Sequence, residues 1–256
     1  LLPNRLHVFK LPTDFWEEAR AELETVKSDI FMLAEAEHPE HHERAFDMSY
    51  SWEFMHIMNE VSKGNKGLAD IDAYMAKEDT NFVKDAYRMM FTTNHDENSW
   101  NGTVFERYGN AHELFATLAF TINGMPLVYG GQEAGNNRRL MFFEKDTVSW
   151  GTYEFQDFYS KLLHLNQSEP ALWNGMHGGD YKRIATENDE EIFAYSRTKD
   201  DSQVIVLLNF ADDAHAVEFK EAISGEYTSI FNGQTLSVFN DSDIKLAPYG
   251  YQVFVK

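Results

Sequence analysis

Cysteine is absent from this sequence, which excludes disulfide bonds, thiolate metal sites and cysteine nucleophiles. Long apolar runs are missing too, since none approaches the roughly 18–20 residues that cross a bilayer. Basic residues are scarce: the sequence has 22 Lys and Arg but 42 Asp and Glu, and its formal net charge is −20. Nucleic-acid binding depends on Lys and Arg that replace counterions, so this charge opposes it. We therefore expect no nucleic-acid partner and no membrane partner.

The residues that are present suffice for a folded core. The chain has 256 residues, of which 43% are hydrophobic and 14% aromatic. Aromatic side chains of this abundance suit either stacking on sugar rings or an aromatic-rich core. The sequence begins at Leu1 with neither an initiator Met nor a signal-peptide pattern, so we expect an internal start. The compartment stays open, with the periplasm and the extracellular space included.

Short apolar runs alternate with helical spacing in the first part of the chain. Phe15, Ala19, Leu23 and Val26 follow helical spacing after Pro12. The predicted strands are 30–34, 45–50, 87–93 and 125–129. Alternating strands and helices are typical of parallel βαβ units, and a full eight-stranded barrel takes about 250 residues. The sequence therefore predicts an α/β fold in which residues 1–170 form half of a TIM-type (β/α)8 barrel, with four parallel βα units.

The remainder of the chain has the strand and turn pattern of an all-β domain. Its predicted strands include 181–187, 191–198, 203–210, 214–219 and 251–255. Asn232-Gly233 predicts a hairpin, because both residue types tolerate the positive φ of a type I′ turn. We predict that residues 171–256 form an antiparallel β-sandwich domain.

Two polar clusters follow the ends of predicted strands, where barrel enzymes hold their active sites. Glu35 follows the first strand, and His95-Asp96 follow the third. A carboxyl group at the mouth of an apolar strand is expected to be partly shielded from water, which suits it to donate a proton. An ionised Asp beside a His can bind sugar hydroxyls and balance positive charge at an anomeric carbon. Acidic residues also begin helices and loops after strands, so position alone leaves both interpretations open.

Five segments resemble, in order, the motifs of the alpha-amylase family, glycoside hydrolase family thirteen. They are FMLAEAEHPE, FDMSYSWEF, FTTNHDENSW, GMPLVYGGQEAG and the closing APYGYQVFVK. The first three are similar to the segments of strands five to seven, the fourth to the strand-eight signature, and the last to the end of the C-terminal β-domain. The resemblance implies that Glu35 is the general acid/base, and that His95 and Asp96 bind the sugar at the cleavage site.

One departure from the family pattern concerns the nucleophile. The Gly-Xaa-Arg-Xaa-Asp motif that carries the family's nucleophilic Asp does not occur before Glu35. A retaining glycosidase needs this second carboxyl group about 5–5.5 Å from the acid. We therefore expect a fragment that lacks strands one to four and is inactive alone. We assign no cofactor and no metal, because the family's calcium sites lie largely in the part we expect to be missing. An open half-barrel is also expected to self-associate.

Several other residues admit two interpretations. Trp100 and Tyr50 are predicted to stack on glucose rings, with helix packing as the alternative. His41 and His42 read as a solvated loop rather than a metal site. Glu133 is expected to hold the strand-eight loop by hydrogen bonds. Arg138-Arg139 could clamp that loop or line the sugar site.

Together these features predict that the intact parent protein is a retaining α-glycosidase. It is expected to act on α-glucans or maltooligosaccharides by hydrolysis or transglycosylation. The alternative is a non-catalytic amylase-like interaction or glucan-binding module. Such modules tend to lose the acid and the His-Asp pair, whereas Glu35, His95 and Asp96 are all present here.

Overall fold

The structure is a computed structural model that describes residues 11–239 and 244–256. In the first part of the chain it forms a four-stranded parallel sheet in the order β1-β2-β3-β4, as the sequence predicts. Its strands are β1 (Leu33–Ala34), β2 (Met48–Tyr50), β3 (Tyr87–Met90) and β4 (Met125–Pro126). Residues 1–10 of the predicted barrel portion lie outside the described residues.

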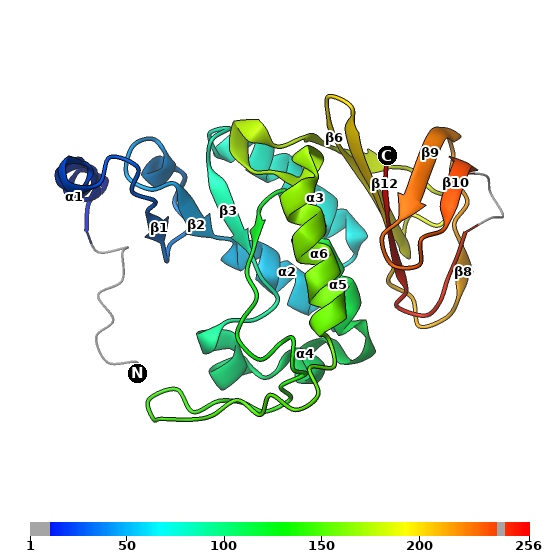
Figure 1. Cartoon of the computed structure of the whole chain (residues 1–256), viewed down its shortest axis with the longest axis horizontal. Coiled ribbons are helices and arrows are strands. Elements are labelled where there is room, and N and C mark those ends of the chain that lie inside the picture. The colour runs from blue at the N-terminus through cyan, green and yellow to red at the C-terminus, as the bar shows by residue number, and fades with distance from the viewer. Residues whose placement is uncertain (1–10, 240–243) are drawn as a thin grey trace.

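Six α-helices accompany this sheet in the described part of the chain. They are α1 (Thr13–Val26), α2 (Trp52–Ser62), α3 (Leu68–Asn81), α4 (Val104–Tyr108), α5 (His112–Thr121) and α6 (Gln156–Ser168). Short turns of helix complete this part: η2 (Pro39–His42), η3 (Glu97–Asn101), η4 (Gly109–Ala111), η5 (Pro170–Leu172) and η6 (Gly175–His177). Figure 1 shows α2, α3, α5 and α6 between the parallel strands and the C-terminal sheet. No helix of the described residues is long and apolar enough to span a membrane.

The C-terminal part is antiparallel, as predicted. Six strands form one sheet in the order β10-β9-β12-β7-β6-β5, and β8 and β11 form a separate two-stranded ribbon. Their bounds are β5 (Asp180–Ile184), β6 (Ile192–Lys199), β7 (Ser202–Asn209), β8 (His215–Ala216), β9 (Ile223–Ser229), β10 (Thr235–Phe239), β11 (Lys245–Leu246) and β12 (Tyr251–Val255). The layer that packs on the main sheet is therefore a ribbon rather than a second full sheet.

Alternation along the central strands buries both faces of the six-stranded sheet. Phe193 and Tyr195 of β6 join the core around the helices, whereas Ile192 and Ala194 pack toward the ribbon. Thr121 of α5 lies 2.6 Å from the Tyr195 hydroxyl, so a hydrogen bond also joins the two parts. The helices and the C-terminal sheet consequently share one hydrophobic core.

Two local predictions need correction. A hairpin does join β9 and β10, but only Gly233 of its Asn232-Gly233 pair has positive φ, at 72°, so the turn is not type I′. Gly233 N–H instead donates to the Ser229 carbonyl at 3.0 Å, which closes a wider turn. His41 and His42 are not solvated: they are 3% and 7% exposed, because η2 folds back over β2 and Phe46.

Candidate functional site

Glu35 lies directly after β1, at the carboxyl end of the parallel sheet. The approach to this strand is held by Asp47, whose carboxylate accepts a hydrogen bond from the Met32 N–H at 2.7 Å. Arg20 of α1 donates to the same carboxylate through both terminal nitrogens, at 3.0 and 3.1 Å. The start of β1 is thus fixed to β2 and α1, and this fixes where Glu35 leaves the sheet.

His95 and Asp96 follow β3 on a helical turn that Asn94 begins. The Asn94 side-chain oxygen accepts from the Asp96 N–H at 3.0 Å and from the Glu97 N–H at 2.8 Å, as an N-cap residue does. Asn94 is 1% exposed, so this cap is anchored in the interior. It directs the next two side chains toward the end of the sheet.

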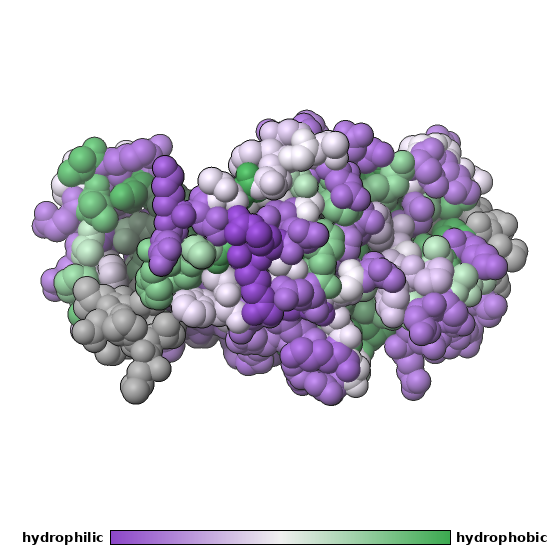
Figure 2. All heavy atoms as spheres, turned by 90° about the horizontal axis from the view of Figure 1, so that it is seen from below, coloured by the Kyte–Doolittle hydropathy of each residue, from purple (hydrophilic) through white to green (hydrophobic). Residues whose placement is uncertain are grey.

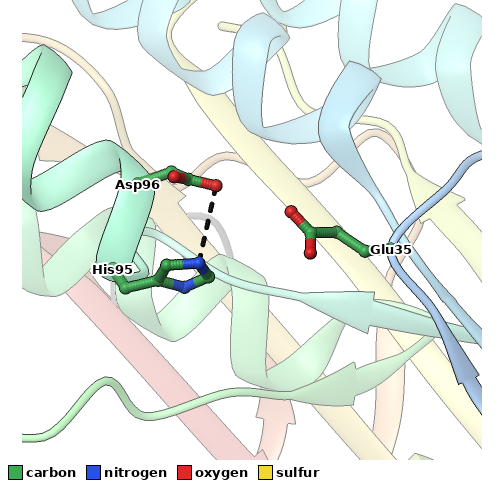
Figure 3. A group of neighbouring side chains, drawn as sticks. All are labelled: Glu35, His95 and Asp96. Carbon is green, nitrogen blue, oxygen red and sulfur yellow. Dashed lines mark ion pairs between the residues drawn. The ribbon is translucent and has the colours of Figure 1, made fainter. Parts of the chain in front are cut away.

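The structure brings Glu35, His95 and Asp96 together (Figure 3). One ligand atom from each of the three lies within 4.8 Å of the others. His95 Nε2 is 3.6 Å from Asp96 Oδ2, an ion pair when the imidazole is protonated. Residues 60 positions apart in the sequence therefore meet at one site, as their places after β1 and β3 predict. The predicted shielding of Glu35 is wrong: the residue is exposed in the described chain, because the sheet end around it is open.

The chemistry of this group is that of proton transfer and charge stabilisation. A carboxyl group can donate a proton, while a neighbouring carboxylate stabilises positive charge that develops on a bound substrate. The same three side chains could also ligate a cation, since His, Asp and Glu are common ligands. Exposed acidic groups gather in this way without a metal too, so the geometry alone assigns none.

The two aromatic residues predicted to stack on sugars have different surroundings. Trp100 is 48% exposed and belongs to η3, the turn that follows Asp96. Tyr50 is 8% exposed, stacks on Trp52 at 5.3 Å and meets the edge of Phe91 at 5.5 Å. Trp100 thus presents a ring near the site, whereas Tyr50 takes part in packing at the end of β2. Sugar stacking by either residue stays a prediction.

The loop after β4 is tied down by residues that sequence reasoning assigned only in part. Glu133 accepts from the Gly131 N–H at 2.9 Å, which confirms its expected structural role. Arg138 pairs with Asp146, and Arg139 with Glu106, so both arginines act as clamps. The Arg139 guanidinium, as the largest cause, lowers the pKa of Glu106 to about 2.

Three supporting residues escaped the sequence reasoning. Gln132 donates to the Thr92 hydroxyl and to the Tyr159 hydroxyl, both at 3.0 Å, and so links the loop to the segment after β3 and to α6. Asn98 bridges η3 to the loop through the Leu140 N–H at 2.8 Å. Asn94 offered the one available signal, an Asn that directly precedes a turn after a strand.

Two sizeable cavities lie away from this site. One, of about 520 Å³, is lined by residues of α3, the start of β3 and η6. The other, of about 550 Å³, lies where the α2–α3 turn meets the loops of the C-terminal sheet. Glu35, His95 and Asp96 line neither of these two cavities.

Comparison with protein families agrees with this architecture. The model described as "Alpha amylase, catalytic domain" matches residues 9–204, and that of the maltogenic amylase C-terminal domain matches residues 181–253. The curated alpha-amylase MalA of Haloarcula japonica is 26% identical over 252 residues, which cover 95% of this chain and 36% of MalA. The chain therefore spans about a third of the length of that relative.

Solved structures share the fold. A maltogenic alpha-amylase, AmyB from Thermotoga neapolitana, superposes with a TM-score of 0.80 at 22% identity, over 96% of this chain and 58% of AmyB. AmyP in complex with maltotriose superposes with a TM-score of 0.72 at 15% identity, over 97% of this chain and 63% of AmyP. The parallel sheet, its helices and the C-terminal antiparallel sheet are thus found together in solved amylases.

Proposed function

The chain belongs to the alpha-amylase family of glycoside hydrolases, and from this premise we propose that it carries the acid/base and sugar-binding residues of a retaining α-glycosidase. The substrate class is α-glucans or maltooligosaccharides. One observation carries the proposal: Glu35 meets His95 and Asp96 within 4.8 Å at the carboxyl end of the sheet. The maltotriose complex of AmyP supports the substrate class.

In this proposal each residue has a distinct task. Glu35 protonates the glycosidic oxygen as its bond to the anomeric carbon breaks, and a nucleophilic carboxylate from outside this chain takes up the glycosyl group. Glu35 then takes a proton from the water that releases the sugar from that carboxylate. Asp96 balances the positive charge of the oxocarbenium-like transition state, and His95 holds a sugar hydroxyl beside it. Trp100, exposed at the edge of the site, offers a ring on which a sugar can stack.

We further propose that these four strands are strands five to eight of a barrel. The sheet order β1-β2-β3-β4 and the order of the motifs support this assignment, as does the length of MalA. The family's nucleophile motif is absent from the sequence, so the chain alone should not hydrolyse glycosidic bonds. Release of reducing sugar from maltooligosaccharides by the chain alone would contradict this.

The acid/base assignment is tested in the chain joined to a strand-one-to-four half from the same family. We expect Glu35→Gln to lower the rate of reducing-sugar release from maltooligosaccharides by about a thousandfold, because the amide cannot transfer a proton. Glu40→Gln is the matched control, since it removes a carboxylate of the same segment whose side chain is 57% exposed. Equal rates for the Glu35→Gln and unmodified enzymes would refute the assignment.

We also propose that the chain by itself associates with a second copy. Residues near β1 support this: Phe31 and Leu33 are 50% and 42% exposed. Figure 2 shows apolar groups at the same, left-hand end of the molecule. Apolar groups that gather in this way favour a partner.

A further inference from the structure

A buried arginine lines the cavity of about 520 Å³ that lies beside α3, the start of β3 and η6. Arg197 of β6 is 2% exposed. Its Nε donates to the Gly179 carbonyl at 3.1 Å and its Nη2 to the Trp173 carbonyl at 3.3 Å, whereas Nη1 has no partner among the described residues. A buried cation is normally paired with an anion, because removal of a charge from water is costly. The Arg197 guanidinium therefore lacks the partner that its burial calls for.

The carboxylates of the cavity lining do not supply this partner. Glu78 pairs with Arg88 at 2.7 Å. Asp79 and Asp180 are exposed, and in the described part of the chain neither forms a hydrogen bond with Arg197. Burial lowers the pKa of Arg197 to about 10, and the charge of Asp180 opposes this shift only in part. At neutral pH the guanidinium is thus charged, with backbone carbonyls as its bonded partners.

Other polar atoms of the lining also lack partners. Asn123 and Asn174 each bury a side-chain oxygen that accepts no hydrogen bond from the described residues. Apolar and aromatic side chains form another part of the wall: Tyr74, Met75, Phe82, Met90, Trp173 and Tyr181. The cavity thus combines an unpaired cation, unsatisfied amide oxygens and rings. It suits a ligand that has a charged group at one end and an apolar body.

We propose that this cavity binds a small aromatic monocarboxylate, whose carboxylate group pairs with the Arg197 guanidinium. The two groups match in charge and in planar geometry, which makes their hydrogen bonds strong. The ring of the ligand packs on the aromatic side chains of the wall. The cavity lies at the amino end of the parallel strands, beside Arg88 at the start of β3 and Gly124 before β4. Glu35 lies at the opposite end of the sheet, so this proposal does not depend on the proposed glycosidase function.

The charges around the cavity favour a monoanion. Lys84 adds an exposed positive charge to the lining, but Asp79 and Asp180 add two negative ones. These carboxylates repel a dianion such as phosphate more strongly than a monoanion. The net charge of −20 opposes any anion at long range. At physiological ionic strength this field is screened over about 8 Å, so that contacts inside the cavity decide the affinity.

Isothermal titration calorimetry of the full chain with benzoate tests the site. We expect saturable binding of benzoate, and binding of the neutral isostere benzamide that is at least about tenfold weaker, because charge-assisted hydrogen bonds are the stronger ones. Arg197→Met should abolish benzoate binding. Equal affinities for benzoate and benzamide, or no benzoate binding by the unmodified chain, would overturn the proposal. So would inorganic phosphate that displaces benzoate at equal concentration, since the site would then take anions of any kind.

A pair of variants at Met176 keeps the test independent of stability, because replacement of Arg197 also removes two hydrogen bonds to the backbone. Met176 lines the cavity and is 60% exposed. Met176→Glu places a carboxylate at the cavity and should lower the benzoate affinity about threefold or more. Met176→Gln, which is neutral and of similar length, should retain the affinity, and benzoate should raise its urea midpoint as in the unmodified chain. Equal benzoate affinities of the two Met176 variants would show that benzoate binds elsewhere.

Discussion

His42 is a buried imidazole at the centre of a polar group behind the parallel sheet. Its Nε2 lies 2.7 Å from the Ser49 hydroxyl, to which Arg88 also donates. Arg88 in turn pairs with Glu37 and Glu78. Burial raises the pKa of both carboxyl groups, because desolvation outweighs the attraction of Arg88. Burial lowers the pKa of His42 to about 4, and the charge of Arg88 acts in the same direction.

The titration of His42 gives a prediction with a definite sign. The unfolded imidazole titrates near 6.5, so between that pH and about 4 the unfolded state binds more protons. The free energy of unfolding must therefore decrease as the pH falls through this window. Through this group alone we expect a loss of about 2 kcal/mol between about pH 7 and about pH 4.5. In His42→Gln this contribution to the loss of unfolding free energy should vanish. Urea unfolding at several pH values across the same window measures it.

The control for this experiment is His38→Gln. It removes an imidazole whose side chain is 42% exposed, four positions earlier on the same segment. Subtracting each variant's curve from that of the unmodified chain cancels the titration of the other groups, Glu37 and Glu78 included. If the free energy of unfolding fell with pH equally in His42→Gln and in the unmodified chain, His42 would not be the source of the pH dependence.

The entry to β4 shows how a single position governs an element. Gly124 has φ of 143°, and a Cβ there would lie 2.5 Å from the Arg88 carbonyl oxygen and 2.5 Å from Met90. The close approach lets β4 pair with β3 in register, Met125 opposite Met89. Glycine is therefore required at this point for two reasons, its backbone conformation and the space.

We expect Gly124→Ala to lower the free energy of unfolding by about 2–4 kcal/mol, because β4 must move or remain strained. Gly64→Ala is the comparison. It shares a positive φ, 73°, but its Cβ would meet nothing within 4 Å, so about 1 kcal/mol is expected. Urea unfolding of both variants measures the difference. Equal losses would mean that the contact with β3 is unimportant.

At this scale the sequence predicted the elements better than their extents. The apolar run 30–34 was expected to pair throughout, but only Leu33–Ala34 does so, and 125–129 pairs only at Met125–Pro126. Apolar periodicity reports burial, whereas strand bounds depend on which backbone groups find partners across the sheet. The meeting of Glu35 with Asp96 was predictable, because residues after parallel strands share one sheet end. The place of the loop after β4 was not predictable, since the Asn98 side chain, which accepts a hydrogen bond from the Leu140 N–H, lies 42 positions away in the sequence.

For the whole molecule, the core continues from the helices into the C-terminal sheet. Leu114 and Phe115 of α5 belong to the same buried cluster as Phe193 and Val206 of the sheet. The predicted boundary near residue 170 thus separates two kinds of secondary structure but not two cores. This continuity ties the helices to the C-terminal sheet through buried apolar contacts.

The opposite end of the molecule lacks such cover in the described chain. No residue of α1 is buried, although Phe15, Leu23 and Val26 follow the helical spacing of a packed face. They are 45%, 42% and 86% exposed. Phe31 and Leu33 lie just before and within β1, which Figure 1 shows at the same end of the molecule as α1. The exposed apolar groups of this end are ones that another polypeptide can cover.

We expect this surface to drive association of the chain with itself, so that the sedimentation coefficient rises with concentration over about a hundredfold range. Leu23→Glu with Val26→Glu should keep the chain monomeric, because two carboxylates on each copy would face each other at the contact. Val83→Glu, which alters a valine that is 45% exposed after α3, should leave association unchanged. A chain that stays monomeric throughout, and binds no dye specific for exposed apolar surface, would show that α1 needs no partner. Association that persists in the double variant would place the contact elsewhere, at the open edges of β1 or β4.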